Sequence, residues 1–351
     1  MEKSLKQAGK YTADENLFFS DSLRELIFDL PERSQEIILN RYGVFLPNKM
    51  TLEEIGKKHR ITRERVRQII REVLKKIRDK KEHPVFIQIQ EKITLALQSN
   101  SGIMEESHII SVLGKGNTNE EAAARFFLEC LEDVLGNEVK NELKFSYALK
   151  DFKFDHWKNV KNAAIETLKN HKKPLPFDIL FEHINKTKNL DIPKETLKHF
   201  LQVSGELSKN AFDKWGIVDW KEISPKGTRE KAYLVIKEFG KPLHFREIAK
   251  KIDQNRLNKK KTHPQTVHNE LIKDSNFVLV GRGIYALVEW GYKRGTVKDV
   301  IEEIIKNSAK PLKKEEIIEK VLAVRQVKES TIVINLNNYF SKSKEGTYSI
   351  K

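Results

Sequence analysis

A short basic segment in the first quarter of the chain carries side chains that can hydrogen-bond to the edges of nucleobases. It reads Thr62-Arg-Glu-Arg-Val-Arg-Gln-Ile69. An arginine offers a forked pair of donors that fits O6 and N7 of guanine, a glutamine can pair twice with adenine, and a glutamate accepts from the amino group of cytosine. On one surface these groups could discriminate bases, each good pair contributing about 1–3 kcal/mol. The alternative interpretation is the ordinary solvated face of a charged helix.

Two short helices joined by a tight turn would position these side chains. Thr51 and Glu54 have the spacing of a capping box that starts the first helix, the turn falls at residues 59–61, and Thr62 is a suitable N-cap for the second helix. Apolar residues at helical spacing predict the buried face of that helix: Val66, Ile69 or Ile70, Val73, Leu74 and Ile77. The opposite face would expose Arg63, Glu64, Arg67, Gln68 and Arg71. This is the end of a helix-turn-helix that enters the DNA major groove.

A longer stretch around this segment resembles region 4 of the sigma-70 family. The resemblance runs through Leu30-Pro-Glu-Arg-Ser-Gln-Glu-Ile-Ile-Leu-Asn-Arg-Tyr-Gly43, Thr51-Leu-Glu-Glu-Ile-Gly56 and the second helix, so we expect such a domain over residues 21–83. In that family the domain reads an upstream promoter element in double-stranded DNA and holds the flap of the RNA polymerase β subunit. The resemblance implies that Arg63, Glu64, Arg67 and Gln68 read bases. It places these residues near DNA phosphates: Arg33, Arg41, Thr51, Leu52, Arg71 and Lys75.

This stretch departs from the family in two ways. Ile70 stands where the family commonly has a glutamate and Glu72 where it often has a basic residue, so a phosphate contact is lost or moves to Arg71. The family's aromatic-rich region that melts promoter DNA is also missing, so a complete initiating sigma factor is not expected. Residues 57–81 nevertheless hold twelve Lys or Arg against three acids, which predicts several phosphate contacts and a steep salt dependence.

The rest of the chain contains a repeated module. Lys173-Pro-Leu175, Lys241-Pro-Leu243 and Lys310-Pro-Leu312 begin 68 and 69 residues apart, each between two helical patterns. We therefore predict three tandem copies, over residues 155–224, 225–292 and 293–351. Helical patterns at 86–97, 105–112 and 120–131 make residues 84–154 a candidate degenerate copy, and residues 1–20 would be an N-terminal extension.

The clearest copy, residues 225–292, has the order of a winged helix. Two helices, at 230–239 and 245–252, flank the Lys-Pro-Leu turn, and Thr262 with Pro264 would open a third. The hairpin Gly281-Arg-Gly283 would be the wing. This copy resembles the HARE-HTH family, which occurs in a polymerase subunit, some restriction endonucleases and chromatin proteins. We therefore predict a mainly α fold: a helix-turn-helix domain plus tandem winged helix-turn-helix modules with small β wings.

The same copy offers secondary candidates for DNA contact. Lys259, Lys260 and Lys261 form a basic loop ahead of the third helix. Gln265, His268 and Asn269 would face outward from that helix, where base contact and plain solvent exposure are equally good interpretations. Arg282 at the wing tip could reach a minor groove or could simply be exposed.

Composition narrows the functional class. The formal net charge is +15, with 65 Lys and Arg against 50 Asp and Glu, which would attract a polyanion. The single cysteine, Cys130, lies among apolar residues and excludes internal disulfides, and no apolar run approaches the length of a membrane span. Histidines and acids show no spacing typical of a metal or catalytic site. We expect a non-enzymatic cytoplasmic protein associated with the nucleoid, with no cofactor, no metal and no membrane partner.

The resulting hypothesis is a sequence-specific DNA-binding transcription regulator that contacts promoter-like double-stranded DNA and bacterial RNA polymerase through its β flap. Two alternatives stay open. The chain could act through protein contacts alone, as a polymerase-binding inhibitor or appropriator, or it could be the DNA-specificity subunit of a restriction-type system. The sequence leaves the oligomeric state open.

Overall fold

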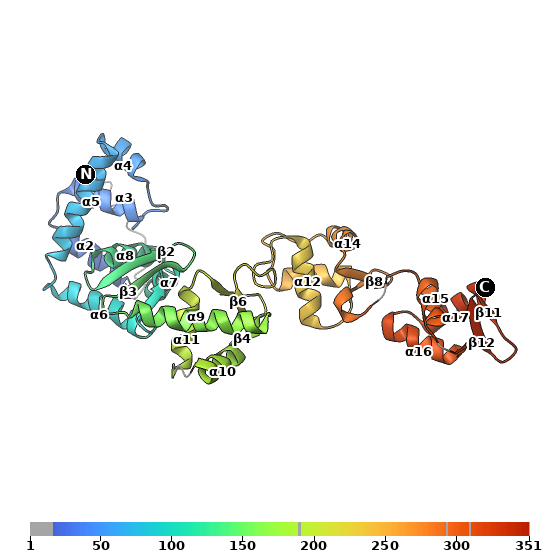
Figure 1. Cartoon of the computed structure of the whole chain (residues 1–351). Coiled ribbons are helices and arrows are strands. Elements are labelled where there is room, and N and C mark those ends of the chain that lie inside the picture. Colours follow the sequence, from blue (N-terminus) through green and yellow to red (C-terminus); the bar gives the residue numbers. More distant parts are fainter. Residues whose placement is uncertain (1–16, 189–190, 293, 309, 351) are drawn as a thin grey trace. The chain divides into compact units, whose positions relative to one another are not determined.

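A computed structural model describes residues 17–188, 191–292, 294–308 and 310–350 (Figure 1). The predicted N-terminal extension lies outside these residues as far as residue 16. The chain divides into two compact units, one holding residues up to 208 except 174–176, and the other holding 174–176 and the residues from 209 onward. Helices dominate and the sheets are small and three-stranded, so the predicted fold class is confirmed.

Four helices form the first domain: α2 (Phe18–Ile27), α3 (Glu32–Tyr42), α4 (Leu52–His59) and α5 (Arg63–Arg78). The capping box is confirmed, because the Glu54 backbone N–H donates to Thr51 Oγ1 (3.2 Å) and the Thr51 N–H donates to Glu54 Oε2 (2.7 Å). Thr62 likewise caps α5, accepting from the Arg65 N–H at 3.1 Å. The expected buried face of α5 is also confirmed, with both Ile69 and Ile70 buried, except that Leu74 is only half-buried.

The turn between α4 and α5 depends on a close approach of two backbone segments. The Ile61 N–H donates to the Gly56 carbonyl at 2.9 Å, and Arg60 adopts the left-handed conformation, with φ of 53°. A Cβ on residue 56 would lie 2.7 Å from the Ile61 carbonyl oxygen. Only glycine therefore allows α4 to pack this tightly on the turn that orients α5.

One order of elements then recurs along the described residues: helix, short strand, two helices and a two-stranded hairpin, which we call the wing. We number these stretches repeats 1 to 4, at residues 84–149, 154–217, 228–287 and 297–350. Repeat 1 contains α6 (Pro84–Gln98), β1 (Ile103–Glu105), α7 (Glu106–Gly114), α8 (Thr118–Cys130), β2 (Val134–Val139) and β3 (Leu143–Leu149). Repeat 2 contains α9 (Phe154–His171), β4 (Leu175–Pro176), α10 (Phe177–Lys188), α11 (Lys194–Val203), β5 (Leu207–Lys209) and β6 (Lys214–Ile217).

Repeat 3 contains α12 (Thr228–Phe239), β7 (Leu243–His244), α13 (Phe245–Gln254), α14 (Pro264–Lys273), β8 (Phe277–Gly281) and β9 (Ile284–Leu287). A 3-10 turn (Val288–Trp290) follows it. Repeat 4 contains α15 (Val297–Lys306), β10 (Leu312–Lys313), α16 (Lys314–Val324), α17 (Glu329–Tyr339), β11 (Phe340–Lys342) and β12 (Thr347–Ile350). In every sheet the last strand lies between the other two, in the orders β1-β3-β2, β4-β6-β5, β7-β9-β8 and β10-β12-β11. The domain boundaries drawn from the sequence stay predictions.

Thr262 does not have its expected role in repeat 3. The N-cap of α14 is His263, while Thr262 is buried and donates through its backbone N–H (2.9 Å) and its hydroxyl (2.5 Å) to Asp253 Oδ1. The carboxylate at the end of α13 thus binds the residue that local spacing made a good cap.

The first domain and repeat 1 share one hydrophobic core. Phe19, Ile37 and Ile77 of the domain belong to the same buried cluster as Phe126 and Cys130 of α8. Polar contacts seal its edge. Tyr42 donates to Glu129 at 2.7 Å, and the Arg78 guanidinium donates to the carbonyls of Glu129 (2.8 Å) and Cys130 (2.9 Å). Repeat 1 therefore covers the side of the domain formed by α2, the end of α3 and the end of α5.

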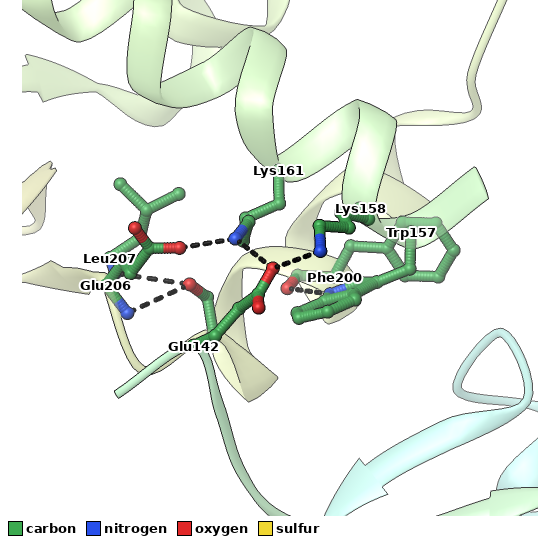
Figure 2. A network of polar contacts seen from close by, with 8 residues as sticks. Glu142, Trp157, Lys158, Lys161, Phe200, Glu206 and Leu207 are labelled. Carbon is green, nitrogen blue, oxygen red and sulfur yellow. Dashed lines mark hydrogen bonds and ion pairs between the residues drawn. The ribbon is translucent and has the colours of Figure 1, made fainter. Parts of the chain in front are cut away.

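The wing of repeat 1 is fixed against the helices of repeat 2 (Figure 2). Lys161 of α9 is 2% exposed and its ammonium lies between two carboxylates, those of Glu142 in the wing turn (2.8 Å) and Glu206 after α11. The Glu142 carbonyl also accepts from the Gly205 N–H at 2.9 Å. Hydrogen bonding from Lys161 holds the pKa of Glu142 below its usual value.

The next two wings also contact the repeat that follows. Phe212, in the turn of the repeat 2 wing, packs edge-on against Phe239 of α12, with ring centroids 6.3 Å apart. In repeat 3 the Val280 carbonyl accepts from the Gln326 N–H of repeat 4 at 3.1 Å, and the Arg325 guanidinium donates to the Leu279 carbonyl. The wings thus connect neighbouring repeats.

Candidate nucleic-acid interface

The first turns of α5 expose the side chains that the sequence assigned to base reading. Arg63, Glu64 and Gln68 are exposed, and 40% of the Arg67 side chain is accessible. The Thr62 cap and the turn at Gly56 fix where the helix starts, and its buried face packs on the domain core. The structure therefore gathers these four residues on one end of one helix.

Glu64 and Arg67 are paired with each other on this face. The Arg67 Nε donates to Glu64 Oε2 at 2.8 Å, and its Nη2 donates to the other carboxylate oxygen. This hydrogen bonding lowers the pKa of Glu64 and raises that of Arg67, so both remain charged at neutral pH. Each side chain holds the other in place, yet part of the hydrogen-bonding capacity of both is already in use.

Arg65 is a further candidate that the sequence reasoning missed. It is exposed, and its Nη1 donates to Gln68 Oε1 at 3.2 Å and lies 3.4 Å from Glu72 Oε1. A guanidinium three residues before Gln68 on a helix can reach that amide, and this spacing was a usable signal. Arg65 can therefore orient the Gln68 amide or contact a phosphate beside it.

The predicted phosphate-contacting residues fall into two groups. Arg71 and Lys75 are exposed on α5, one and two turns beyond Arg67. Arg33, Arg41, Thr51 and Leu52 lie outside α5, and two of them already have structural partners. Arg33 Nη2 donates to the His59 carbonyl at the end of α4 (2.5 Å), and the Thr51 hydroxyl takes part in the capping box. Arg41 and Leu52 are half-buried, and the Leu52 backbone N–H belongs to the free first turn of α4.

The secondary candidates in repeat 3 lie before α14, on α14 and at the wing tip. Lys259, Lys260 and Lys261 are exposed ahead of its first turn. Gln265 is exposed and His268 half-buried on the helix itself, and Gln265 donates to Asn269 Oδ1 at 3.2 Å. Arg282 is exposed at the wing tip.

The structure also brings His268 close to the wing. Its ring packs against the tilted ring of Phe245 (4.6 Å between centroids), and the Phe245 N–H donates to the wing carbonyl of Gly283 at 3.0 Å. The helix face and the wing are therefore adjacent, while the three lysines precede the first turn of α14.

Three other kinds of feature would point to a different function in the described part of the chain: a metal site, a membrane-spanning helix and a reactive thiol. Among those residues no three His, Cys, Asp or Glu side chains are grouped so that they could hold a metal ion, and no helix is long and apolar enough to cross a membrane. Burial raises the pKa of the Cys130 thiol well above its ordinary value.

Comparison with known proteins identifies two segments. Residues 26–79 match the family model described as Sigma-70, region 4, and residues 228–290 match the HARE-HTH model, whose description names ASXL and a restriction endonuclease HTH domain. The RNA polymerase principal sigma factor HrdD of Streptomyces griseus is 45% identical over 58 residues, which are 16% of this chain and 18% of that protein. The RNA polymerase sigma factor RpoS of Coxiella burnetii is 38% identical over 64 residues, 18% of each chain.

The similarity to these relatives is confined to one domain, since the chain spans only 18% of their length. Both resemblances drawn from the sequence are confirmed at the segments where they were drawn. At the level of families, the chain combines a sigma-70 region 4 domain with a HARE-HTH module, both helix-turn-helix domains of DNA-binding kinds.

Proposed function

We propose that the chain is a sequence-specific transcription regulator that places the N-terminal turns of α5 in the major groove of promoter-like duplex DNA. The observation that carries this is the exposed group of Arg63, Glu64, Arg67 and Gln68 behind a capped helix start. Arginine, glutamate and glutamine together can read guanine, cytosine and adenine. Arg71 and Lys75 continue the same helix toward the phosphates.

The proposal includes contact with bacterial RNA polymerase through its β flap. Support comes from the relatives, whose names describe RNA polymerase sigma factors. The face formed by α2, the end of α3 and the end of α5 is covered by repeat 1, so a polymerase contact must use other surface. A groove of about 260 Å³ with an apolar floor of Leu30, Ile61 and Val73 remains open on a flank of α5.

The test is selection of binding sites from random duplex DNA by the full chain and by a variant with Arg63→Ala, Arg67→Ala and Gln68→Ala. A control variant changes Lys150, Lys153 and Lys169 to alanine, because these cations are exposed outside the interface. We expect a defined motif for the wild type and the control, and loss of the motif with retention of salt-sensitive nonspecific binding in the variant. Selection of the same motif by the variant would refute base reading by α5.

A role through polymerase contact alone predicts a different outcome. An inhibitor that acts only by occupying polymerase would tolerate Arg67→Ala, since the side chain would meet no base. Transcription from a selected promoter, measured with purified polymerase and each variant, therefore separates the two functions.

A further inference from the structure

We propose that repeat 3 is a second duplex-DNA contact, in which Lys259, Lys260 and Lys261 bind backbone phosphates beside α14, whereas repeats 1 and 2 serve as structural connectors. The inference deepens the proposed function, because it assumes that the chain binds duplex DNA. It assigns unequal roles to repeats that have the same element order.

Repeat 1 has no free third helix. In a winged helix the third helix and the wing are the elements that contact DNA. Here α8 packs on α2, α3 and α5, and its Glu120 side chain is 3% exposed and accepts hydrogen bonds from Phe19 N and Ser20 N of the first domain, both at 2.8 Å. The wing turn is bound to Lys161. Both DNA-contacting elements are thus occupied by the chain itself.

The third helix of repeat 2 is also partly covered. His199 of α11 lies 3.0 Å from the Ser101 hydroxyl of repeat 1, and Lys144 of β3 donates to the Gln202 carbonyl at 2.8 Å. An isolated bridge joins Leu143 to Ser204. The sheet of repeat 1 therefore lies along a flank of α11 that a DNA groove would need.

Repeat 3 differs from repeats 1 and 2 because its third helix packs only on its own repeat, against α12, α13 and β8, in the main contacts of the described residues. Gln265, Thr266, Asn269 and Lys273 are exposed along it, together with one apolar residue, Ile272, which is 62% accessible. Its one glutamate, Glu270, is neutralised by Arg229 at 2.5 Å. The outward face is therefore open and mostly polar, with no unpaired acidic side chain.

The lysine loop of repeat 3 is held rigidly at both ends. Asn258 accepts from the Lys231 ammonium (2.5 Å) and donates to the Thr262 hydroxyl (2.7 Å), and Thr262 is bonded in turn to Asp253. The three lysines between these anchors are exposed, and in the described part of the chain none of them pairs with a carboxylate. The loop that carries them is therefore anchored at both ends, and their ammonium groups are available to phosphates without breaking an existing ion pair.

Repeat 4 lacks this loop. The segment between α16 and α17 contains Arg325, which is 6% exposed and donates to the carbonyls of Leu279 and Gly295. The exposed side chains of α17 include Ile334, which is 58% accessible, and Glu329. Its third helix therefore offers no comparable cationic surface.

The test is equilibrium binding of the full chain to random duplex DNA over a series of salt concentrations, with Lys259, Lys260 and Lys261 changed to alanine. The control is again the variant at Lys150, Lys153 and Lys169, which removes the same charge. The logarithm of the binding constant falls with the logarithm of the salt concentration, and each lost phosphate contact makes that slope less steep by about 0.9. We therefore expect the slope of the triple variant to be less steep by about 2–3 and that of the control to change little.

The same substitutions are then made in the background of Arg63→Ala, Arg67→Ala and Gln68→Ala. An effect of the lysines that persists there supports repeat 3 as a site even if α5 reads no bases. Slopes equal to those of the control in both backgrounds would overturn the inference while leaving the role of α5 intact. A larger loss of binding to single-stranded RNA than to duplex DNA would overturn it as well, and thermal unfolding checks that each variant is folded.

Discussion

Glu64 and Arg67 restrain each other on the exposed start of α5, and this pair bears directly on discrimination. The Glu64 carboxylate fixes the position of the Arg67 guanidinium and partly neutralises its charge. Arg67 therefore interacts less favourably with a DNA phosphate at a nonspecific site. Like-charge repulsion between Glu64 and the DNA backbone further disfavours wrong sites. Specificity here needs a repulsive element as well as an attractive one.

Glu64→Gln is therefore expected to raise affinity for random duplex DNA and to lower the ratio of specific to nonspecific binding. The matched control is Glu53→Gln, which removes an exposed carboxylate paired with Lys57 (2.8 Å) on α4. Binding constants for a selected site and for a scrambled site measure both quantities. Equal changes in the ratio for the two variants would show that only net charge matters.

Gly56→Ala should destabilise the first domain, because the new Cβ would lie 2.7 Å from a backbone oxygen. Overpacking of this kind costs about 1–3 kcal/mol. Gly227→Ala is the control for added volume, since a Cβ there meets nothing within 4 Å and the change affects only the N-cap of α12. We expect a larger decrease in the midpoint of thermal unfolding for Gly56→Ala than for Gly227→Ala, and equal midpoints for the two variants would contradict the turn geometry.

At the scale of single residues, the sequence predicted most of the candidate site, because helix caps and helix faces follow from residues three or four positions apart. Arg63, Glu64 and Gln68 were placed outward from that spacing alone. The pairing of Arg67 with Glu64 was not predicted, although their spacing of three residues on a helix was a usable signal. Thr262 was misassigned because it donates to Asp253, nine residues away, and does not cap the helix.

At the scale of elements, the wing of repeat 1 attaches repeat 1 to repeat 2 through Glu142 and Lys161, and we infer no DNA contact for it. Glu142 and Glu206 both neutralise the buried ammonium of Lys161, and a buried cation without partners would be costly. The sequence predicted small β wings for the later modules, but it predicted neither a wing within residues 84–154 nor the surface that lies against it. A hairpin pattern is local, whereas the covering surface comes from another repeat.

The ion pair between Glu142 and Lys161 should weaken in acid. The pKa of Glu142 is lowered in the folded chain, first by the hydrogen bond from Lys161, so its contribution is present above the unfolded pKa and is lost as the pH falls through the lower folded value. Glu142→Gln is expected to cost about 1–3 kcal/mol at neutral pH. The difference in unfolding midpoint from the wild type should shrink below about pH 4, near the ordinary carboxyl pKa.

Glu302→Gln supplies the control for this experiment, because Glu302 forms an exposed pair with Lys306 four residues away (2.7 Å). Exposed pairs of this kind contribute little to stability. If Glu142→Gln and the control have the same unfolding midpoint at every pH, the ion pair between Glu142 and Lys161 does not hold repeats 1 and 2 together.

At the scale of the whole molecule, the helix-turn-helix domain is not an independent unit. The N-cap residue of α2, Leu17, offers no side-chain cap, and the Glu120 carboxylate of repeat 1 takes that role by accepting from Phe19 N, Ser20 N and the Ser20 hydroxyl. No periodicity within the domain predicts this, since a hundred residues separate the partners. The matched family segment, residues 26–79, excludes both of them.

Glu120→Ala should therefore destabilise the DNA-reading domain from a distance. Loss of a capping acceptor costs about 0.5–2 kcal/mol, and the two backbone N–H groups left buried add to it. Because the core is continuous, we expect the domain and repeat 1 to unfold together at a lower temperature, with the α5 amides losing hydrogen-exchange protection as fast as those of α8. Glu138→Ala, at an exposed site on β2, should change neither the unfolding temperature nor the exchange protection of α5. Retained protection of α5 while α8 exchanges would mean that the domain folds alone and that repeat 1 is only attached to it.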